Sequence, residues 1–332
     1  MRILGIETSC DETSAAVVED GSKILSNVIA SQTDIHKQFG GVVPEVASRR
    51  HVELILPTIS QALSEAGCGI DEIDCIGVIN RPGLIGALIV GVAAAKTIAY
   101  AANLPLVAVH HLEAHIHANW LTGTRIEFPV VCLVVSGGHS DLIYMTGHGQ
   151  YEILARTRDD AAGEAFDKCA RAMGLGYPGG PLIDKAAKEG NAHWIRFPRA
   201  KVGDSLDFSF SGLKTAVIRY VGGPQTASLP DVAASFQQAI VDVLVDHTFQ
   251  AARAKGVSQV LMAGGVAANS RLQADMKARG EELGIQVVAP PPILCTDNAA
   301  MAGAAAFFAY EREELAGLDL DCFASEPIGR RN

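Results

Sequence analysis

The chain has 332 residues, of which 48% are hydrophobic and 19% are charged, a composition that supports large buried cores and excludes an intrinsically disordered chain. At roughly 150 residues per domain, the length predicts two domains. The formal net charge of −10 argues against a protein that binds nucleic acid by itself, because such binding relies on a basic face, but it leaves room for nucleic acid held together with partner proteins.

Seven cysteines are scattered along the chain without a C-x-x-C pair, which argues against a disulfide framework and against a cysteine zinc site. The N-terminal sequence reaches Glu7 before a signal-like apolar stretch forms. The longest uncharged apolar run, residues 82–95, is too short to span a bilayer. We therefore expect a soluble, cytoplasmic protein with no membrane association.

Short apolar runs, β-branched in part, predict buried strands, and helical patterns lie between them. In chain order, strands are expected at residues 3–6, 75–79, 130–135 and 259–262, and helices at residues 51–65, 85–101, 163–173, 230–254 and 271–283. A strand–turn–strand order recurs at residues 2–19 and 130–145, and a strand–turn–helix–strand order recurs at residues 74–109 and 259–288.

These recurrences predict an α/β protein built from two copies of one unit. We expect an N-terminal lobe at residues 1–125 and a C-terminal lobe at residues 126–326, with the last helix, about residues 297–315, packing back toward the first lobe. The polar stretch 121–129, which contains glycine and proline, marks the boundary. One continuous doubly wound sheet is the alternative.

Four of the ten histidines lie between positions 110 and 117 and give the sharpest chemical signal. His111 and His115 are four residues apart, so on a helix they share a face with Cβ atoms about 5–6 Å apart, which suits two imidazoles on one metal ion. Glu113 faces away from His111, and the segment lacks the H-E-x-x-H order of zincin proteases. A helix start with hydrogen-bonded histidines is the alternative.

A third ligand has to come from elsewhere in the chain. Asp297 is the candidate, because it stands just before a predicted helix of small residues, 299–310. Taken alone, an aspartate at that place is more often a helix N-cap. Two histidines and one carboxylate form a ligand set with open positions that suits Fe²⁺, with Zn²⁺ as an alternative.

Glycine turns follow two of the expected strands. Ser136-Gly137-Gly138 follows one of them and Gly264-Gly265 follows the other, with Asn269 at the start of the next helix. Backbone N–H groups with no Cβ in the way can hold an anion, and the recurrence favours nucleotide binding over ordinary turns. The G-x-G-x-x-G match at residues 174–179 follows a helix rather than a strand, so it does not indicate a Rossmann site.

Acidic residues stand beside these turns. Asp11 and Glu12 lie in the first turn, Asp167 follows Gly163, and Asp184 follows a pair of glycines. A carboxylate in a phosphate site usually handles a metal, a ribose hydroxyl or a proton, although each of these could be solvated or capping a helix. The basic and aromatic stretch at residues 193–201 suits RNA or, equally, a solvated loop.

In their order along the chain, the motifs resemble those of bacterial tRNA N6-adenosine threonylcarbamoyltransferases, the TsaD-type family once called O-sialoglycoprotein endopeptidases. The matching stretches cover nearly the whole length and are Gly5–Thr13, Gly40–Glu45, Ala47–Arg49, His111–His115, Val135–His139, Asp160–Lys168, Tyr177–Pro181, Phe208–Lys214, Gly264–Asn269 and Thr296–Asn298. Two positions depart from the family's pattern. Arg81 and Ala114 stand where the family commonly has glycine.

The resemblance implies an actin-like, duplicated two-lobe fold with a central cleft, as in sugar kinases and Hsp70 (the ASKHA folds). It implies that His111, His115 and Asp297 bind one divalent metal, with Fe²⁺ the usual ion and Zn²⁺ or Mg²⁺ as alternatives. The residues that it implies for the nucleotide and acyl donor are Val134, Val135, Ser136, Gly137, Gly138, Asp167, Gly180, Asp184 and Asn269. Candidates for the general base are Asp11, Glu12 and His139.

The family transfers a threonylcarbamoyl group from threonylcarbamoyl-AMP to N6 of adenosine-37 in tRNAs that read ANN codons. The resemblance therefore implies a metal-assisted acyltransferase whose partners are tRNA, an inactive paralogue (TsaB) and a small ATPase (TsaE). The alternatives are an ATP-dependent small-molecule kinase of the same fold, a metalloprotease and a non-catalytic nucleotide sensor. The kinase gives no role to His111 and His115, and the protease leaves the glycine turns unused.

Overall fold

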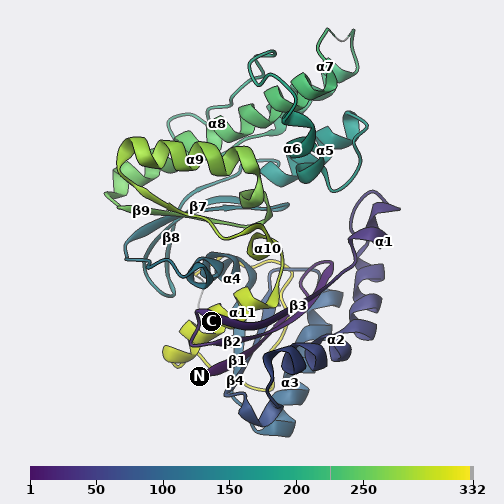
Figure 1. Ribbon diagram of the computed structural model, residues 1–332, viewed down its shortest axis with the longest axis vertical. Helices are drawn as coiled ribbons and strands as arrows, with labels where there is room; N and C mark the ends of the chain where they lie inside the picture. The colour runs from purple at the N-terminus through teal and green to yellow at the C-terminus, as the bar shows by residue number, and fades with distance from the viewer. Residues whose placement is uncertain (225, 330–332) are drawn as a thin grey trace. The chain divides into compact units, whose positions relative to one another are not determined.

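Two five-stranded sheets with the same strand order form the framework of the protein (Figure 1). The first contains β1 (Arg2–Glu7), β2 (Glu12–Glu19), β3 (Lys23–Ser31), β4 (Cys75–Arg81) and β5 (Leu106–His110). The second contains β6 (Val130–Val135), β7 (Ser140–Gly147), β8 (Gln150–Arg156), β9 (Gln259–Ala263) and β10 (Gln286–Val288).

The strand pairing is the same in both sheets. The orders are β3-β2-β1-β4-β5 and β8-β7-β6-β9-β10. In each sheet the first strand pairs antiparallel with the second and parallel with the fourth. This repetition confirms the duplicated α/β unit predicted from the sequence and excludes one continuous sheet for the described strands.

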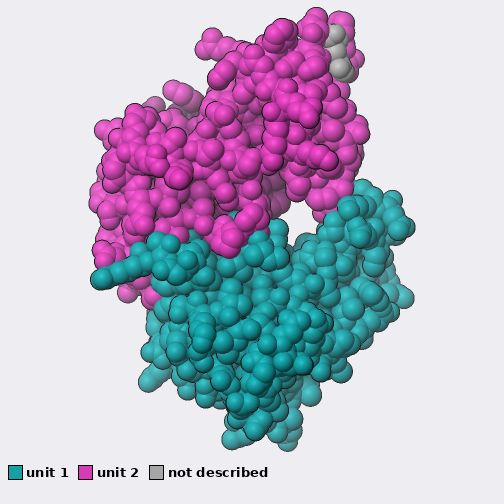
Figure 2. Space-filling view, viewed as in Figure 1, with its two compact units in different colours: residues 1–126, 293–332 teal, residues 127–292 magenta. Residues whose placement is uncertain are grey.

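This structure is a computed structural model that describes residues 1–224 and 226–329. The chain divides into two compact units, each with one sheet (Figure 2). Unit 1 comprises residues 1–126 and 293–332, and unit 2 comprises residues 127–292. The division differs from the lobe limits expected at 1–125 and 126–326 in the C-terminal segment, which is grouped with unit 1.

Helices cover both faces of the first sheet. Helix α11 (Ala299–Glu311) packs on one face, and α2 (Pro44–Ala66) and α3 (Ile85–Ala102) pack on the other. Along β1, Ile3 contacts the α11 side and Leu4 the opposite side, and neither is exposed. A strand covered on both faces reads as a continuous apolar run, which is the pattern that predicted it.

Glycine allows α11 to approach the sheet closely. A Cβ on Gly5 would lie 2.3 Å from the carbonyl oxygen of Ala299, and a Cβ on Gly77 would lie 2.4 Å from the Cβ of Ala306. The buried face of α11 is otherwise built mainly from alanines. Close packing against the sheet therefore explains why α11 is rich in small residues. This packing also brings the segment before α11 to the carboxyl end of β1.

Helix α2 begins at Pro44, seven residues before its predicted start at residue 51. Proline suits the first helical position, because the N–H that it lacks would have no intrahelical partner there. Most side chains in residues 44–50 are exposed or half-buried, so apolar periodicity gave no signal for the first two turns. The helix ends at Gly67, whose φ of 65° is the left-handed conformation that favours glycine.

The remaining predicted helices are confirmed within two residues of their expected ends. They are α3, α5 (Ala162–Ala172), α8 (Leu229–Lys255), α9 (Ser270–Leu283) and α11, which was predicted at residues 299–310. The helices absent from the prediction are α1 (Thr33–Lys37), α6 (Gly179–Ala187), α7 (Ser211–Val221) and α10 (Pro292–Cys295). Three of these have fewer than ten residues, too few to show a clear period.

Helix α3 is long and apolar enough to cross a membrane by length and composition, and it is the one such helix in the described part of the chain. It packs against α2 and β4 within unit 1. Apolar core helices of folded domains pass the same test, so this is weak evidence for a membrane span.

In unit 2, strand β6 has six residues and all are buried. Helix α8 packs on β6 and β7, and α6 and α9 pack on α8. The hydroxyl of Ser228 caps the start of α8 by accepting the backbone N–H of Asp231. Strand β6 thus lies at the centre of its sheet. Its carboxyl end leads into the turn at residues 136–139.

Gly5→Ala should destabilise the protein because the added Cβ would collide with the backbone of α11. Overpacking of this kind typically costs about 1–3 kcal/mol. Gly212→Ala is a matched control, since a Cβ there meets nothing within 4 Å. Urea unfolding of both variants checks the prediction, and equal midpoints would contradict it.

Candidate functional site

Helix α4 (His111–His117) follows β5 directly and carries the paired histidines. His110, the last residue of β5, caps the helix, because its Nδ1 accepts the N–H of Leu112 at 3.2 Å. The rings of His111 and His115 lie one turn apart, with centroids 4.6 Å apart and planes almost perpendicular. The prediction that His111 and His115 share one face of a helix is thus confirmed.

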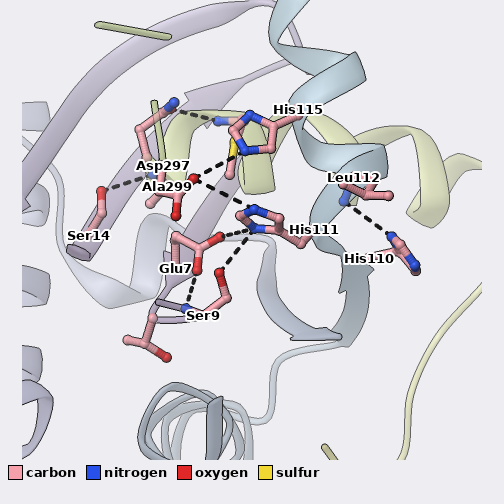
Figure 3. Close-up of polar contacts among 12 residues, drawn as sticks. Glu7, Ser9, Ser14, His110, His111, Leu112, His115, Asp297 and Ala299 are labelled. Atoms are coloured by element: carbon pink, nitrogen blue, oxygen red, sulfur yellow. Dashed lines mark hydrogen bonds and ion pairs between the residues drawn. The ribbon is translucent and has the colours of Figure 1, made fainter. Parts of the chain in front are cut away.

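Asp297 faces both rings from a segment far away in the sequence (Figure 3). Its Oδ1 lies 3.1 Å from Nε2 of His115 and 3.6 Å from Nε2 of His111. The N-cap of α11 is Asn298, whose side chain accepts the N–H of Met301 at 3.1 Å. Because Asn298 caps the helix, the side chain of Asp297 is not used for capping and points to the histidines.

His111 is oriented by residues at the end of β1 (Figure 3). Its Nδ1 lies 3.1 Å from both Oε2 of Glu7 and the hydroxyl of Ser9. The other carboxylate oxygen of Glu7, which is fully buried, accepts the N–H of Ser9. In the neutral ring, a carboxylate at Nδ1 favours the tautomer with the proton on that nitrogen, which leaves the lone pair of Nε2 on the side of Asp297.

The charges of this cluster depend on one another. Burial disfavours a charge on His111, but Asp297 and Glu7 outweigh it and raise its pKa to about 9. Burial acts against the charge of Asp297 too, but the two histidines lower the pKa of this carboxyl. Burial and the neighbouring His111 lower the pKa of His115. Without a metal ion, a proton on His111 therefore balances the buried carboxylate.

The donor set fits a transition-metal ion. One nitrogen from each of His111 and His115 and one oxygen from Asp297 lie within 4.8 Å of one another. This is the one such group among the residues that the structure describes. Two imidazoles and a carboxylate, with an outer carboxylate on one ring, form the ligand arrangement of Fe²⁺ and Zn²⁺ sites, whereas Mg²⁺ prefers oxygen ligands.

Asp11 and Glu12, two candidates for the general base, belong to unit 1 as well. Burial and, less strongly, the charge of Asp297 raise the pKa of Asp11. Burial raises the pKa of Glu12 to about 8, against a hydrogen bond from the hydroxyl of Ser31. A carboxyl group with its pKa in this range meets the electrostatic requirement for a general base near neutral pH.

The third base candidate, His139, lies in unit 2 in the turn between β6 and β7. Its backbone N–H donates to the hydroxyl of Ser136, and its carbonyl accepts the N–H of Ser136. Between them, Gly137 and Gly138 are exposed, and a Cβ on either would meet nothing within 4 Å. The turn therefore presents open backbone to a ligand.

The other nucleotide candidates lie in unit 2 and are linked to this turn by contacts. Gly163 in α5 donates its N–H to Ser136 O, and a Cβ there would lie 2.5 Å from the same oxygen. In the same helix, Asp167 accepts the N–H of Gly179 at 2.7 Å and so caps α6. Burial, opposed by that bond, raises the pKa of Asp167.

Asp184 and Asn269 continue this series of contacts. Asp184 in α6 accepts the hydroxyl of Ser270 at 2.8 Å, and Asn269 caps α9 by accepting the N–H of Leu272 at 3.0 Å. Asn269 also donates to Gln237 at 2.8 Å. The side chains of Asp184 and Asn269 thus have hydrogen-bond partners within unit 2. A structural role of this kind is the alternative to ligand binding that the sequence left open.

Three further predicted residues have no side chain open to a ligand. Val134 and Val135 are fully buried strand residues, and Val134 is paired with neighbouring strands on both sides, so neither presents a side chain to a ligand. Gly180 lies in the first turn of α6, and a Cβ there would meet nothing within 4 Å. The main chain at Gly180 is therefore open in the same way as that of Gly137 and Gly138.

Sequence reasoning missed the roles of Glu7 and Ser9. The available signal was a charged residue inside an otherwise apolar strand, which is buried only when it has a partner.

In the basic stretch at residues 193–201, Arg199 pairs with Asp242 at 2.7 Å, whereas Trp194 is 58% exposed. Part of that positive charge is therefore already balanced within unit 2.

Comparison with known proteins identifies relatives over nearly the whole length. The family model described as tRNA N6-adenosine threonylcarbamoyltransferase matches residues 23–304. Proteins with that name from Symbiobacterium thermophilum and Dehalococcoides mccartyi are 54% and 58% identical, over 98% and 97% of this chain and 97% of each relative. One from Clostridium kluyveri is 53% identical over the whole chain and 99% of the relative.

Solved structures show the fold. HypF from T. kodakarensis superposes with a TM-score of 0.64 at 16% identity, covering 94% of this chain and 48% of HypF. Component A of (R)-2-hydroxyglutaryl-CoA dehydratase from Acidaminococcus fermentans has a TM-score of 0.54 at 15% identity, covering 92% of this chain and 98% of component A. Together with the duplicated sheets, these similarities confirm the actin-like fold class.

Proposed function

The chain belongs to the tRNA N6-adenosine threonylcarbamoyltransferase family, and from that premise we propose how its residues carry out the transfer. It is a transferase of tRNA modification that forms N6-threonylcarbamoyladenosine. The acyl donor that we propose is threonylcarbamoyl-AMP, and the acceptor is the exocyclic amine of adenosine-37 in tRNAs that read ANN codons. That amine is a poor nucleophile, so an activated donor and electrostatic assistance are needed.

The observation that carries the proposal is the convergence of His111, His115 and Asp297. We propose that these residues hold one divalent metal, with Fe²⁺ favoured by the two imidazoles and the carboxylate and Zn²⁺ the alternative. A metal bound there supplies a Lewis acid that stabilises negative charge on the reacting carbonyl or on the leaving phosphate. Glu7 and Ser9 hold the ring of His111 so that Nε2 faces the ion.

Glu12 is the base that the electrostatics favour for the amine proton. Its pKa of about 8 lies nearer to neutral pH than that of an ordinary glutamate, at about 4.3. Asp11 is the alternative in unit 1, and its pKa is raised by burial. A positioned base typically contributes about 10²–10⁴-fold to the rate.

We propose that unit 2 binds the adenylate part of the donor. The exposed backbone at Gly137 and Gly138 suits the phosphate, and the contacts through Gly163, Asp167 and Asn269 hold the surrounding helix ends in place. A kinase on the same fold would use similar turns, but it would leave the His–His–Asp cluster without a role. No observation favours the kinase.

tRNA is the substrate that the family implies, and an acidic chain is expected to need help in holding it. We propose that this help comes from the inactive paralogue and the small ATPase implied by the resemblance. A cytoplasmic location, where tRNA is modified, completes the proposal.

Elemental analysis joined to a transfer assay tests the metal proposal. The wild-type chain should carry about one equivalent of metal and, with tRNA, donor and partner proteins, form the modified adenosine. His111→Ala should lose both, because one of three ligands is gone. His193→Ala is the control for metal content, since His193 is an exposed histidine outside the cluster. Transfer at the wild-type rate by metal-free His111→Ala would refute the proposal.

The pH profile of transfer tests Glu12. A base must be unprotonated to act, so kcat/KM should rise with pH with a midpoint near pH 8 and level off above it, and the midpoint should be lower when a bound cation favours the carboxylate. Glu12→Gln should lower the rate by about 10²–10⁴-fold and remove this rise. Asp11→Asn distinguishes the neighbours, and a wild-type profile in Glu12→Gln would exclude Glu12.

A further inference from the structure

Arg81 departs from the family's usual glycine, and the structure shows what it contacts. It is the last residue of β4, and its register partner in β5 is His110. These two residues thus stand side by side at the carboxyl ends of adjacent parallel strands. His110 immediately precedes the first proposed metal ligand and caps α4.

Both residues contact Glu326 near the C-terminus. Nε of Arg81 lies 3.0 Å from the Oε2 of Glu326, in a pair whose side chains are 20% and 7% exposed. His110 Nε2 lies 3.0 Å from the backbone carbonyl of the same residue. Glu326 is therefore contacted twice, by an ion pair without hydrogen-bond geometry at its side chain and by a hydrogen bond at its main chain.

Hydrogen bonds extend this contact along residues 321–329, which we call the C-terminal strap. Asn80, which is fully buried, donates to the carbonyl of Asp321 at 2.9 Å and accepts the N–H of Phe323 at 3.0 Å. Arg81 also donates to the side chain of Asn80 at 2.7 Å. The strap thus lies along the end of β4, with Arg81 at the centre of its polar contacts.

The strap has little apolar burial of its own. Within residues 321–329, all of which the structure describes, Ile328 is the one buried apolar residue, and most of the others are exposed. A segment of this kind opens locally at low free-energy cost unless specific polar contacts hold it. Removing Arg81 would leave the nearly buried carboxylate of Glu326 without its cation, which favours release of the strap.

A continuous series of contacts connects the strap with the candidate ligands. Glu326 holds His110 through Nε2, and Nδ1 of His110 accepts the N–H of Leu112 at the start of α4. The backbone N–H of Gly329 also donates to the side-chain carboxylate of Glu113, which lies between the two ligands on the same helix. The first turn of α4 is thus fixed from outside by the strap.

We propose that Arg81 and Glu326 form a latch that fixes the C-terminal strap against the start of α4 and so positions His111 and His115 for the metal ion. Arg81 is a positioning residue, since it contacts Glu326 and Asn80 and its charge acts on Glu113, and none of these is a proposed ligand. The inference rests on the proposed metal site. It assigns a role to a residue that the family pattern does not contain.

Co²⁺ titration of the metal-free full-length chain, followed by visible absorption, tests the latch. Arg81→Ala and Glu326→Gln should each weaken Co²⁺ binding by about 10-fold, the lower end of the roughly 10–100-fold range for residues outside the ligand shell. Arg81→Lys keeps a cation for Glu326 and should restore most of the affinity. The matched control is Arg279→Ala, which breaks an exposed ion pair with Glu282 in unit 2.

Hydrogen exchange separates the latch from general instability. Arg81→Ala should raise exchange at residues 321–329 and 110–113, while the midpoint of global unfolding changes little. Unchanged exchange in the strap, or raised exchange with Co²⁺ affinity within twofold of wild type, would overturn the inference. Failure of the wild-type chain to bind Co²⁺ would instead refute the metal site, and the exchange data would still show whether Arg81 holds the strap.

Discussion

The convergence of Asp297 on His111 and His115 is the interaction on which the functional interpretation depends. It joins helix α4, at residues 111–117, to a segment near the end of the chain. The geometry exists because α11 packs on the first sheet, and that packing requires glycine at positions 5 and 77. The close packing of α11 in the core of unit 1 therefore brings Asp297 to the two histidines of the candidate metal centre.

The cluster also shows how burial and charge are balanced. Glu7, His111, His115 and Asp297 are charged or titratable groups at the end of a sheet, and each is stabilised by another member of the group. Burial alone would favour the neutral forms of His111, His115 and Asp297. The carboxylate of Asp297 is most favourable when it meets positive charge, whether a proton on His111 or a metal ion.

Much of this arrangement follows from the sequence, and the exceptions have physical causes. The spacing of His111 and His115 predicts their shared helix face, and the apolar runs predict the central strands, because both signals are local. The pairing of Asp297 with the histidines is a long-range contact, and from the residues alone a helix N-cap was the better interpretation. Asn298 takes that capping role, which only the structure shows. The start of α2 was missed because its first two turns are largely exposed and carry little periodic signal.

The repeated sheet topology places two connections of different chemical character at equivalent positions of the two units. In each unit the connection after the first strand carries functional candidates, which are acidic in one copy, with Asp11 in the turn and Glu12 at the start of β2, and glycine-rich at residues 136–138 in the other. Beyond its strands, the second turn is held by a helix of its own unit, since Gly163 of α5 donates to Ser136. The duplication thus supplies one strand framework twice and fills its equivalent corners with different chemical groups within a single polypeptide.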